Sequence, residues 1–348
     1  MIRVQNIYYM LAYAFQALRQ KMYQSLGTEK FDVLSDLMAA ILIKGVSTLV
    51  KRGLGRGYQE KEEEMPVIRG RLALNETIRR NSLIRRQAVC SYDEFSEDIL
   101  ENQIIKAAML SLLSLVTRPL LKKELQYLLI YFQHVSTVDL RRVQWQGIRM
   151  QRDQTYRMVL AVCQMWKDSL LQTETDGEKR LIVFTEDHMC HLYEKFILEY
   201  YKRHFPCLQA RAAQIPWALD NSFQEWLPVM QSDIMLRRGD DILIIDAKYY
   251  SHTMQTRFGG ERLWSHNLYQ IFAYVKNQDA DMKERDHRVS GMLLYAGTDE
   301  NIQPSVSYSM SGNIIEARTL DMNCDFSHIC DQLDTIASTF FPGVCRTG

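Results

Sequence analysis

The chain has 348 residues, of which 47% are hydrophobic, so it is long and apolar enough for about two domains with packed cores. Its 42 lysines and arginines balance its 42 aspartates and glutamates, which excludes an overall positive field that would attract nucleic acid. No apolar run reaches the roughly eighteen residues of a membrane span, and seven cysteines without a C-x-x-C pair argue against a disulfide framework. We therefore expect a cytoplasmic protein that does not contact a membrane and whose affinity for DNA comes from a local basic patch or from a partner.

The first half of the sequence predicts a largely helical region that one strand-rich segment interrupts. The acidic run at 60–64 is typical of a solvated loop, and residues 66–74 alternate in the manner of a strand, with Gly70 and Arg71 inside it. No glycine-rich segment of the chain matches a nucleotide-binding fingerprint, so a bound nucleotide is not expected. Apolar residues at helical spacing predict helices at 6–26, 31–51, 97–116 and 120–134.

Residues 79–86 are the most basic part of the chain. They could contact phosphate groups or a partner, or they could form a solvated surface. Four acidic residues follow closely in the sequence, which favours the solvated surface. These acids are Asp93, Glu94, Glu97 and Asp98.

A polar stretch at 171–180 lacks apolar periodicity and predicts a boundary between two domains. We expect an amino-terminal domain at 1–175 and a carboxy-terminal domain at 181–348. The second domain begins with a predicted helix at 186–204, which carries Leu192 and Phe196 on one face.

Residues 232–248 are the segment around which the second domain is organised. Two short apolar runs flank Gly239 and Asp240, and a Gly-first pair between hydrophobic residues is typical of a two-residue hairpin turn. Counting outward from this turn places Asp233 opposite Asp246 on one face of the hairpin. Lys248 shares that face, because the side chains of a strand repeat with a period of two.

The two facing aspartates predict a metal site. Like charges at opposed positions destabilise a pair of strands unless something neutralises them, and Mg²⁺ typically binds one or two carboxylates together with water and phosphate oxygens. Lys248 could orient or activate the attacking water. The alternative is that these are ordinary edge-strand charges, but the apolar run at 242–245 predicts a buried strand, and a buried strand that ends in charged residues favours a functional site.

The hairpin is followed by a predicted helix and a further strand. Leu268, Ile271 and Val275 have core spacing on the helix, and Gln270 and Tyr274 lie one turn apart on another of its faces. Residues 289–295 then have the composition of a buried strand.

An Asp followed later in the hairpin by Asp-x-Lys resembles the PD-(D/E)xK nuclease superfamily. That resemblance implies a core of helix, three antiparallel strands, helix and further strand, with metal-dependent hydrolysis of phosphodiester bonds. It also implies that Gln270 and Tyr274 reach the site, and it makes Glu194 a candidate for a third acid. The superfamily's usual proline before the first Asp is replaced here by Ser232.

Further segments narrow the resemblance to the McrC family, the nuclease subunits of McrBC modification-dependent (type IV) restriction systems, and they extend over nearly the whole chain. The segments are VQNIYYMLAYAF at 4–15, GRL at 70–72, YDEFS at 92–96, Asn102 with Ile105 and Lys106, IDAKYY at 245–250 and HNLYQ at 266–270.

The resemblance implies an α+β (mixed) fold, in which a helical amino-terminal region with a strand-rich insertion precedes a restriction-endonuclease-like α/β core. At the site it implies that Asp233, Asp246 and the backbone carbonyl of Ala247 bind Mg²⁺, that Lys248 positions the water, and that Gln270 supports the site. Functionally it implies an endonuclease that cuts DNA carrying 5-methylcytosine only when assembled with a hexameric AAA+ GTPase, which recognises and translocates the DNA. The amino-terminal domain would dock into the GTPase ring and stimulate GTP hydrolysis, and dimerisation of such complexes is compatible with the resemblance.

Two alternatives remain open on the sequence. The chain could be a non-catalytic activator of the GTPase, or it could be a stand-alone repair nuclease of the same superfamily. The first alternative predicts that Asp246→Ala preserves cleavage by the complex, and the second predicts cleavage by the purified chain alone.

Overall fold

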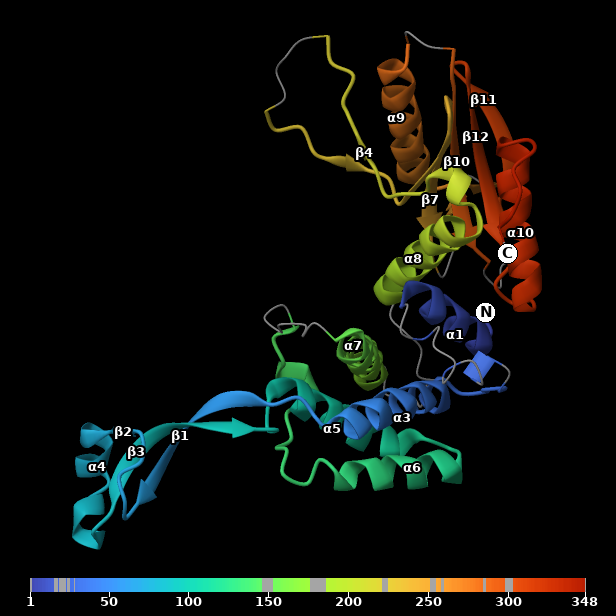
Figure 1. Ribbon diagram of the computed structural model, residues 1–348. Coiled ribbons are helices and arrows are strands. Elements are labelled where there is room, and N and C mark those ends of the chain that lie inside the picture. The colour runs from blue at the N-terminus through green and yellow to red at the C-terminus, as the bar shows by residue number, and fades with distance from the viewer. Residues whose placement is uncertain are drawn as a thin grey trace. The chain divides into compact units, whose positions relative to one another are not determined.

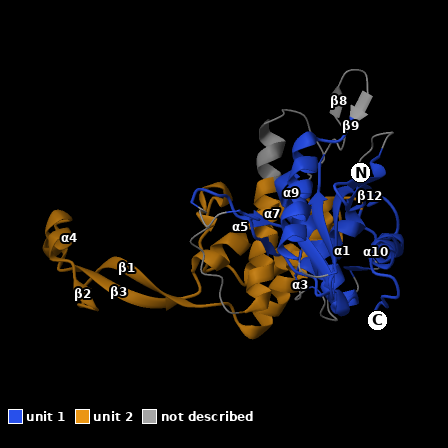
Figure 2. Cartoon of the chain, turned by 90° about the horizontal axis from the view of Figure 1, so that it is seen from above, with its two compact units in different colours: residues 1–31, 184–348 blue, residues 32–183 orange. Residues whose placement is uncertain are grey.

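The chain folds into two compact units. One consists of residues 1–31 and 184–348, and the other of residues 32–183 (Figure 2). The first 31 residues therefore belong to the same unit as the second half, whereas the predicted boundary placed them in the amino-terminal domain. The functional assignment of the two predicted domains stays a prediction. A computed structural model describes residues 2–15, 18, 23, 26–27, 29–145, 153–175, 186–220, 225–250, 255–257, 260–283, 286–297 and 303–347.

The body of the 32–183 unit is a set of packed helices, as predicted. Helix α3 contacts both α6 and α7, and α5 contacts α7. Pro119 begins α6, where a residue without a backbone N–H costs nothing. Helix α7 continues to Thr175, so the predicted linker is helical over its first five residues, and residues 176–180 lie outside the described part. The bounds are α3 Leu34–Arg52, α5 Leu100–Leu115, α6 Pro119–Ile130 and α7 Gln154–Thr175, with a 3₁₀ turn at Leu140–Arg142.

A narrow three-stranded sheet projects from these helices as an arm (Figures 1 and 2). The predicted solvated loop at 60–64 is wrong, because these residues lie on β1, which pairs along its length with β3. The predicted strand at 66–74 shrinks to two residues, since Gly70 has φ +71° and approaches the carbonyl oxygen of Ser91. The bounds are β1 Gly57–Met65, β2 Arg71–Leu72, α4 Leu74–Arg79, a 3₁₀ turn at Ser82–Arg85 and β3 Ala88–Ser96.

The basic segment at 79–86 is neutralised, but by other acids than the sequence indicated. Arg80 lies 3.9 Å from Glu62 and Arg85 lies 2.7 Å from Glu64. Both glutamates come from the acidic run on β1. Because β1 pairs with β3, which follows the basic segment, the two glutamates lie close to these arginines. Arg79 and Arg80 also pair with Glu76.

The other unit is built on a five-stranded mixed sheet in the order β11-β12-β10-β7-β6 (Figure 1). Strands β6 and β7 form the antiparallel hairpin, and β10 runs parallel to both β7 and β12. Of the third antiparallel strand that the superfamily implies, one bridge between Arg211 and Met235 is present beside β6. The bounds are β6 Ile234–Arg238, β7 Asp241–Lys248, β10 Arg288–Ala296, β11 Ser305–Met310 and β12 Asn313–Leu320.

Helices α8, α9 and α10 contact this sheet, and a helix from the start of the chain adds to this layer by packing on α8. Helix α1 packs on α8, where the Tyr13 hydroxyl lies 2.7 Å from Nε2 of His204. The predicted helix at 6–26 ends early, because Phe15 has extended backbone; most of 16–26 lies outside the described residues. The bounds are α1 Val4–Ala14, α8 Glu186–His204, α9 Ser265–Asp281 and α10 Phe326–Phe340, with short elements at Pro206–Leu208, β4 Gln214–Ile215, β5 Met230–Gln231, β8 Gln255–Arg257 and β9 Gly260–Arg262.

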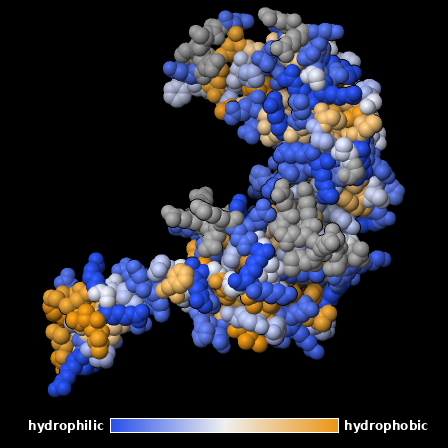
Figure 3. All heavy atoms as spheres, in the orientation of Figure 1, coloured by the Kyte–Doolittle hydropathy of each residue, from blue (hydrophilic) through white to orange (hydrophobic). Residues whose placement is uncertain are grey.

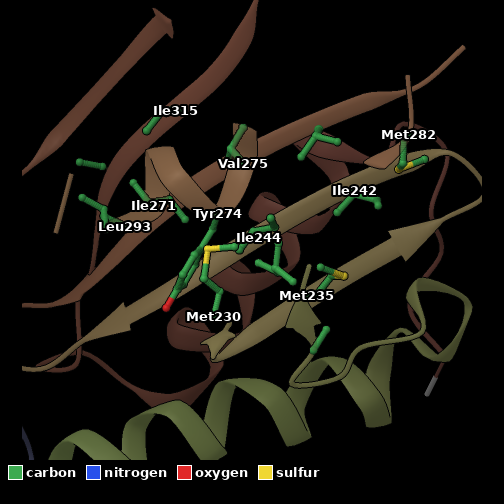
Figure 4. Close-up of a cluster of buried hydrophobic side chains, with 14 of the residues drawn as sticks. Met230, Met235, Ile242, Ile244, Ile271, Tyr274, Val275, Met282, Leu293 and Ile315 are labelled. Atoms are coloured by element: carbon green, nitrogen blue, oxygen red, sulfur yellow. The ribbon is translucent and has the colours of Figure 1, made fainter. Parts of the chain in front are cut away.

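Helix α9 packs on one face of the sheet and forms a hydrophobic core with it. Figure 4 shows Ile271 and Val275 of the helix beside Ile244 of β7 and Leu293 of β10. The α+β fold class is thereby confirmed, as is the predicted strand at 289–295. None of the described helices is long and apolar enough to cross a membrane.

Gly291 of β10 allows this close approach of helix and sheet. A Cβ atom at this position would lie 2.7 Å from Cγ2 of Val275 and 2.8 Å from Cγ1 of Ile271. We expect Gly291→Ala to lower the free energy of unfolding by about 1–3 kcal/mol through overpacking. Urea unfolding monitored by circular dichroism measures this change, and a midpoint equal to that of the parent chain would contradict it.

Candidate active site

The hairpin has the register that the sequence predicted. Arg238 pairs with Asp241 and Ile234 with Ile245, so the next position brings Asp233 opposite Asp246. Gly239 has φ +62°, as the first residue of a primed turn requires. Lys248 is the last residue of β7. The structure therefore brings together the two aspartates and the lysine at the end of a buried strand.

The three side chains interact directly. Nζ of Lys248 lies 2.9 Å from Oδ2 of Asp246, whose side chain is 2% exposed. Oδ2 of Asp233 accepts a hydrogen bond of 2.9 Å from the backbone N–H of Ala247. This bond fixes the Asp233 carboxylate beside Asp246, and it places Ala247 at the site through its backbone.

Burial disturbs the titration of both carboxyls, and the charge of Asp246 adds to the shift of Asp233. Burial raises the pKa of Asp233 to about 8, and the charges of Asp246 and Glu194 act in the same direction. Burial also raises the pKa of Asp246, although Lys248 opposes the shift. Burial alone would lower the pKa of Lys248, but the two aspartates more than offset it, and the pKa lies above its usual value. Without a metal ion the two carboxyls therefore retain a proton at pH values where isolated carboxyls have lost theirs.

Gln270 reaches the same cluster from α9. Its Oε1 accepts a hydrogen bond of 3.3 Å from Nζ of Lys248, and its Nε2 donates one of 3.0 Å to the Tyr274 hydroxyl. The ammonium can only donate, so the amide oxygen faces it, and the Tyr274 hydroxyl accepts from the amide nitrogen at the other end. Asp246 and Gln270 are the hydrogen-bonding or ion-pairing partners of Lys248 among the described residues, and they leave one of its three N–H groups available.

Glu194 lies on α8 near the two aspartates. Its charge contributes to the raised pKa values of both Asp233 and Asp246. The Cys190 thiol donates a hydrogen bond of 3.1 Å to its Oε1, and Nδ1 of His191 lies 3.5 Å from its Oε2. Whether Glu194 takes part in the chemistry stays a prediction.

Sequence reasoning missed three residues beside the site: Tyr250, Asn267 and Tyr295. The Tyr250 hydroxyl donates to Oδ1 of Asn267, and Nδ2 of Asn267 donates to the Tyr295 hydroxyl. Tyr295 pairs with Lys248 across β10 and β7. The available signal was periodicity, because Tyr250 follows Lys248 by two residues, just beyond the end of β7, and Asn267 precedes Gln270 by about one helical turn.

The residues present fit a divalent cation with hard oxygen ligands. Oδ2 of Asp246 is buried and accepts no hydrogen bond of good geometry, and its partner is the Lys248 ammonium. Over the described part of the chain, no group of three or more His, Cys, Asp or Glu side chains is arranged to hold a metal. Two carboxylates and a backbone carbonyl, completed by water and phosphate oxygens, are a donor set typical of Mg²⁺ and not of zinc.

Comparison with known proteins identifies a family and agrees with the fold. A family model described as "McrBC 5-methylcytosine restriction system component" matches residues 3–296. The chain belongs to this family. It is 29% identical to the type IV methyl-directed restriction enzyme EcoKMcrBC of Escherichia coli K12 over 339 residues, which cover 95% of this chain and 96% of that protein.

Two solved structures resemble this member of the McrBC family. One is a refined half-complex from a tetradecameric assembly of Thermococcus gammatolerans McrB AAA+ hexamers with bound McrC; its TM-score is 0.52 at 19% identity, covering 96% of this chain and 76% of that chain. The other is the cryo-EM structure of the Thermococcus gammatolerans McrBC complex, with a TM-score of 0.41 at 20% identity over 57% of this chain and 58% of that chain. The first likeness extends over nearly the whole chain and confirms the fold.

Proposed function

We propose that this McrBC family member is the endonuclease subunit of a 5-methylcytosine-dependent restriction complex. It would hydrolyse DNA phosphodiester bonds with Mg²⁺ when it is assembled with an AAA+ GTPase hexamer, and it would stimulate GTP hydrolysis by that hexamer. The observation that carries the proposal is the convergence of Asp233, Asp246, Lys248 and Gln270 at the end of a buried hairpin.

Each residue of the cluster has a role in this chemistry. Asp233, Asp246 and the carbonyl oxygen of Ala247 would hold the cation. When bound, Mg²⁺ supplies a polarised phosphate and a water of lowered pKa. The available N–H of Lys248 orients the attacking water, and its positive charge stabilises the negative charge that develops on the phosphate oxygens. Gln270 helps to hold the ammonium in place through its hydrogen bond from Nζ.

The arm of the 32–183 unit supports the docking part of the proposal. Its end carries apolar side chains that are more than half exposed, whereas such residues are normally buried. Figure 3 shows apolar surface gathered at this end. The residues are Val67, Ile68, Leu74, Ile78, Leu83 and Ile84. We infer that these six residues, the arm tip, contact the GTPase ring.

Two substitutions at the arm tip test the docking. Leu83 is 66% exposed and Ile84 is 83% exposed, so replacing both with serine removes little packing within the chain. We expect stimulation of GTP hydrolysis to fall roughly tenfold, because an apolar contact of this size is worth on the order of 1–2 kcal/mol. Thermal stability should not change.

Leu120→Ser is the matched control, since Leu120 is 68% exposed on α6, outside the arm. It should stimulate GTP hydrolysis as the parent chain does. Full stimulation by the arm-tip variant would contradict docking through this surface.

The proposed function is tested by assembling the chain with its GTPase partner and measuring cleavage of methylated and unmethylated DNA with GTP and Mg²⁺. We expect cleavage of methylated DNA that requires both GTP and the partner. Cleavage by the chain alone would favour a stand-alone nuclease. Stimulated GTP hydrolysis without any cleavage would favour a non-catalytic activator.

A further inference from the structure

A second amide lies beside the candidate active site, at the start of α9. Asn267 is fully buried, and both ends of its amide are hydrogen-bonded to tyrosine hydroxyls. Its Oδ1 accepts a bond of 3.3 Å from Tyr250, and its Nδ2 donates one of 3.2 Å to Tyr295. One side chain of α9 thus joins strand β10 to the segment that follows β7.

The two tyrosines flank Lys248. Tyr295 is the direct partner of Lys248 in the parallel pairing of β10 with β7, so both side chains leave the same face of the sheet. Tyr250 follows Lys248 by two residues, and the rings of Tyr250 and Tyr295 lie 6.5 Å apart. Because β7 ends at Lys248, strand pairing holds the backbone before this residue but not after it. The bond from Tyr250 to Asn267 ties down the chain at that point.

Asn267 differs from Gln270 in how it can act. Gln270 touches the Lys248 ammonium directly, whereas both hydrogen bonds of Asn267 go to tyrosines. A buried amide costs free energy unless its hydrogen bonds are made. Here they are made to Tyr250, two residues beyond Lys248 along the chain, and to Tyr295, the partner of Lys248 across the sheet.

We propose that Asn267 is a positioning residue of the nuclease, which acts through the hydroxyls of Tyr250 and Tyr295 to hold the end of β7 so that Lys248 reaches the attacking water. The inference rests on the proposed function. Catalytic groups must be held to within about half an ångström of the productive geometry, and residues that lock them contribute to the rate without touching the substrate.

The test uses Asn267→Ala, Tyr250→Phe and Tyr295→Phe in the full chain, assembled with the GTPase partner on methylated DNA with saturating GTP and Mg²⁺. We expect kcat to fall roughly tenfold for Asn267→Ala and severalfold for each Phe variant. KM for DNA should stay within about twofold, and so should the Mg²⁺ affinity of the variant chain measured by calorimetry. The double variant Asn267→Ala, Tyr295→Phe should be no slower than Asn267→Ala, because both changes break the same connection.

Tyr201→Phe is the control for a general loss of stability. The Tyr201 hydroxyl is buried and donates one hydrogen bond of 3.0 Å to the carbonyl oxygen of Leu333 on α10, so this variant also loses one buried bond. Its kcat should equal that of the parent chain. If Asn267→Ala does not fold, the two Phe variants decide the question.

Parental kcat in Asn267→Ala and in both Phe variants would overturn the inference, as would an equal loss in Tyr201→Phe. Losses that multiply in the double variant would also overturn it. Absence of cleavage by the parent complex would instead overturn the proposed function itself, so the two failures are distinguishable.

Discussion

Asp246→Asn is expected to lower DNA cleavage by the assembled complex by at least roughly a thousandfold, because it removes a charged ligand that the proposed chemistry requires. The substitution keeps the size of a residue that is 1% exposed, and it removes a carboxylate whose pKa is raised by burial. Stimulation of GTP hydrolysis should remain intact, since we propose that it depends on the other unit. Single-turnover cleavage and GTP hydrolysis measured on the same preparation separate the two activities.

Asp240→Asn is the matched control for that experiment. Asp240 lies in the turn of the same hairpin, is exposed, and has Arg237 at 3.9 Å as a distant partner. It undergoes the same chemical change at the opposite end of the strands and should cleave as the parent chain does. Parental cleavage by Asp246→Asn would leave only the activator alternative.

Asp233→Asn is expected to separate stability from activity. In the metal-free chain the substitution removes one of two carboxylates that face each other in a buried site, so thermal stability should rise or stay unchanged while cleavage is lost. Added Mg²⁺ should stabilise this variant less than the parent chain, because the ion binds more weakly to a folded state with one carboxylate fewer.

Lys248→Ala should behave in the opposite way. It leaves both acids without their counter-charge, so the metal-free fold becomes less stable, while Mg²⁺ still stabilises it.

The pH dependence of the stability of the metal-free parent chain follows from the same two aspartates. The pKa of Asp233 rises from 3.8 in the unfolded chain to about 8 in the folded chain, so the folded state binds more protons between these values. Its contribution to the stability of the fold is therefore present below about pH 4 and is lost progressively as the pH rises toward 8. Melting temperatures of Asp233→Asn should show a flatter profile over this range. A profile as steep as that of the parent would mean that Asp233 does not cause the dependence.

The parts of the fold that sequence reasoning identified are those fixed by local chemistry. The hairpin follows from a glycine that can adopt positive φ between two apolar runs, and the turn alone then determines which residues face each other. Helix α8 was predicted with its observed bounds, because its apolar spacing begins and ends with the helix. Gln270 and Tyr274 were found in the same way, since helical spacing places them on one face.

The parts that were missed depend on contacts between distant segments. Nothing local in residues 4–14 indicates that Tyr13 packs on Phe196 of α8, which is why the predicted boundary separated α1 from its unit. The acidic run at 60–64 has the charge of a solvated loop, so its pairing with β3 is not evident from the sequence. The arginines that neutralise Glu62 and Glu64 come later in the chain. Helical spacing places Asn267 about one turn before Gln270, but only the folded chain brings it beside Tyr250 and Tyr295.

Asp233 and Asp246 are proposed to share one divalent cation, and an anomalous difference map tests this most directly. Mn²⁺ substitutes for Mg²⁺ at sites with carboxylate and water ligands and scatters anomalously. In crystals of the full chain soaked in Mn²⁺, we predict one strong peak between the two carboxylates, within about 2.0–2.3 Å of an oxygen of each. The peak should be absent from Asp246→Asn crystals. Crystals of the parent chain soaked in saturating Mn²⁺ that show no peak at this position, or that show the peak at other residues, would contradict a shared cation.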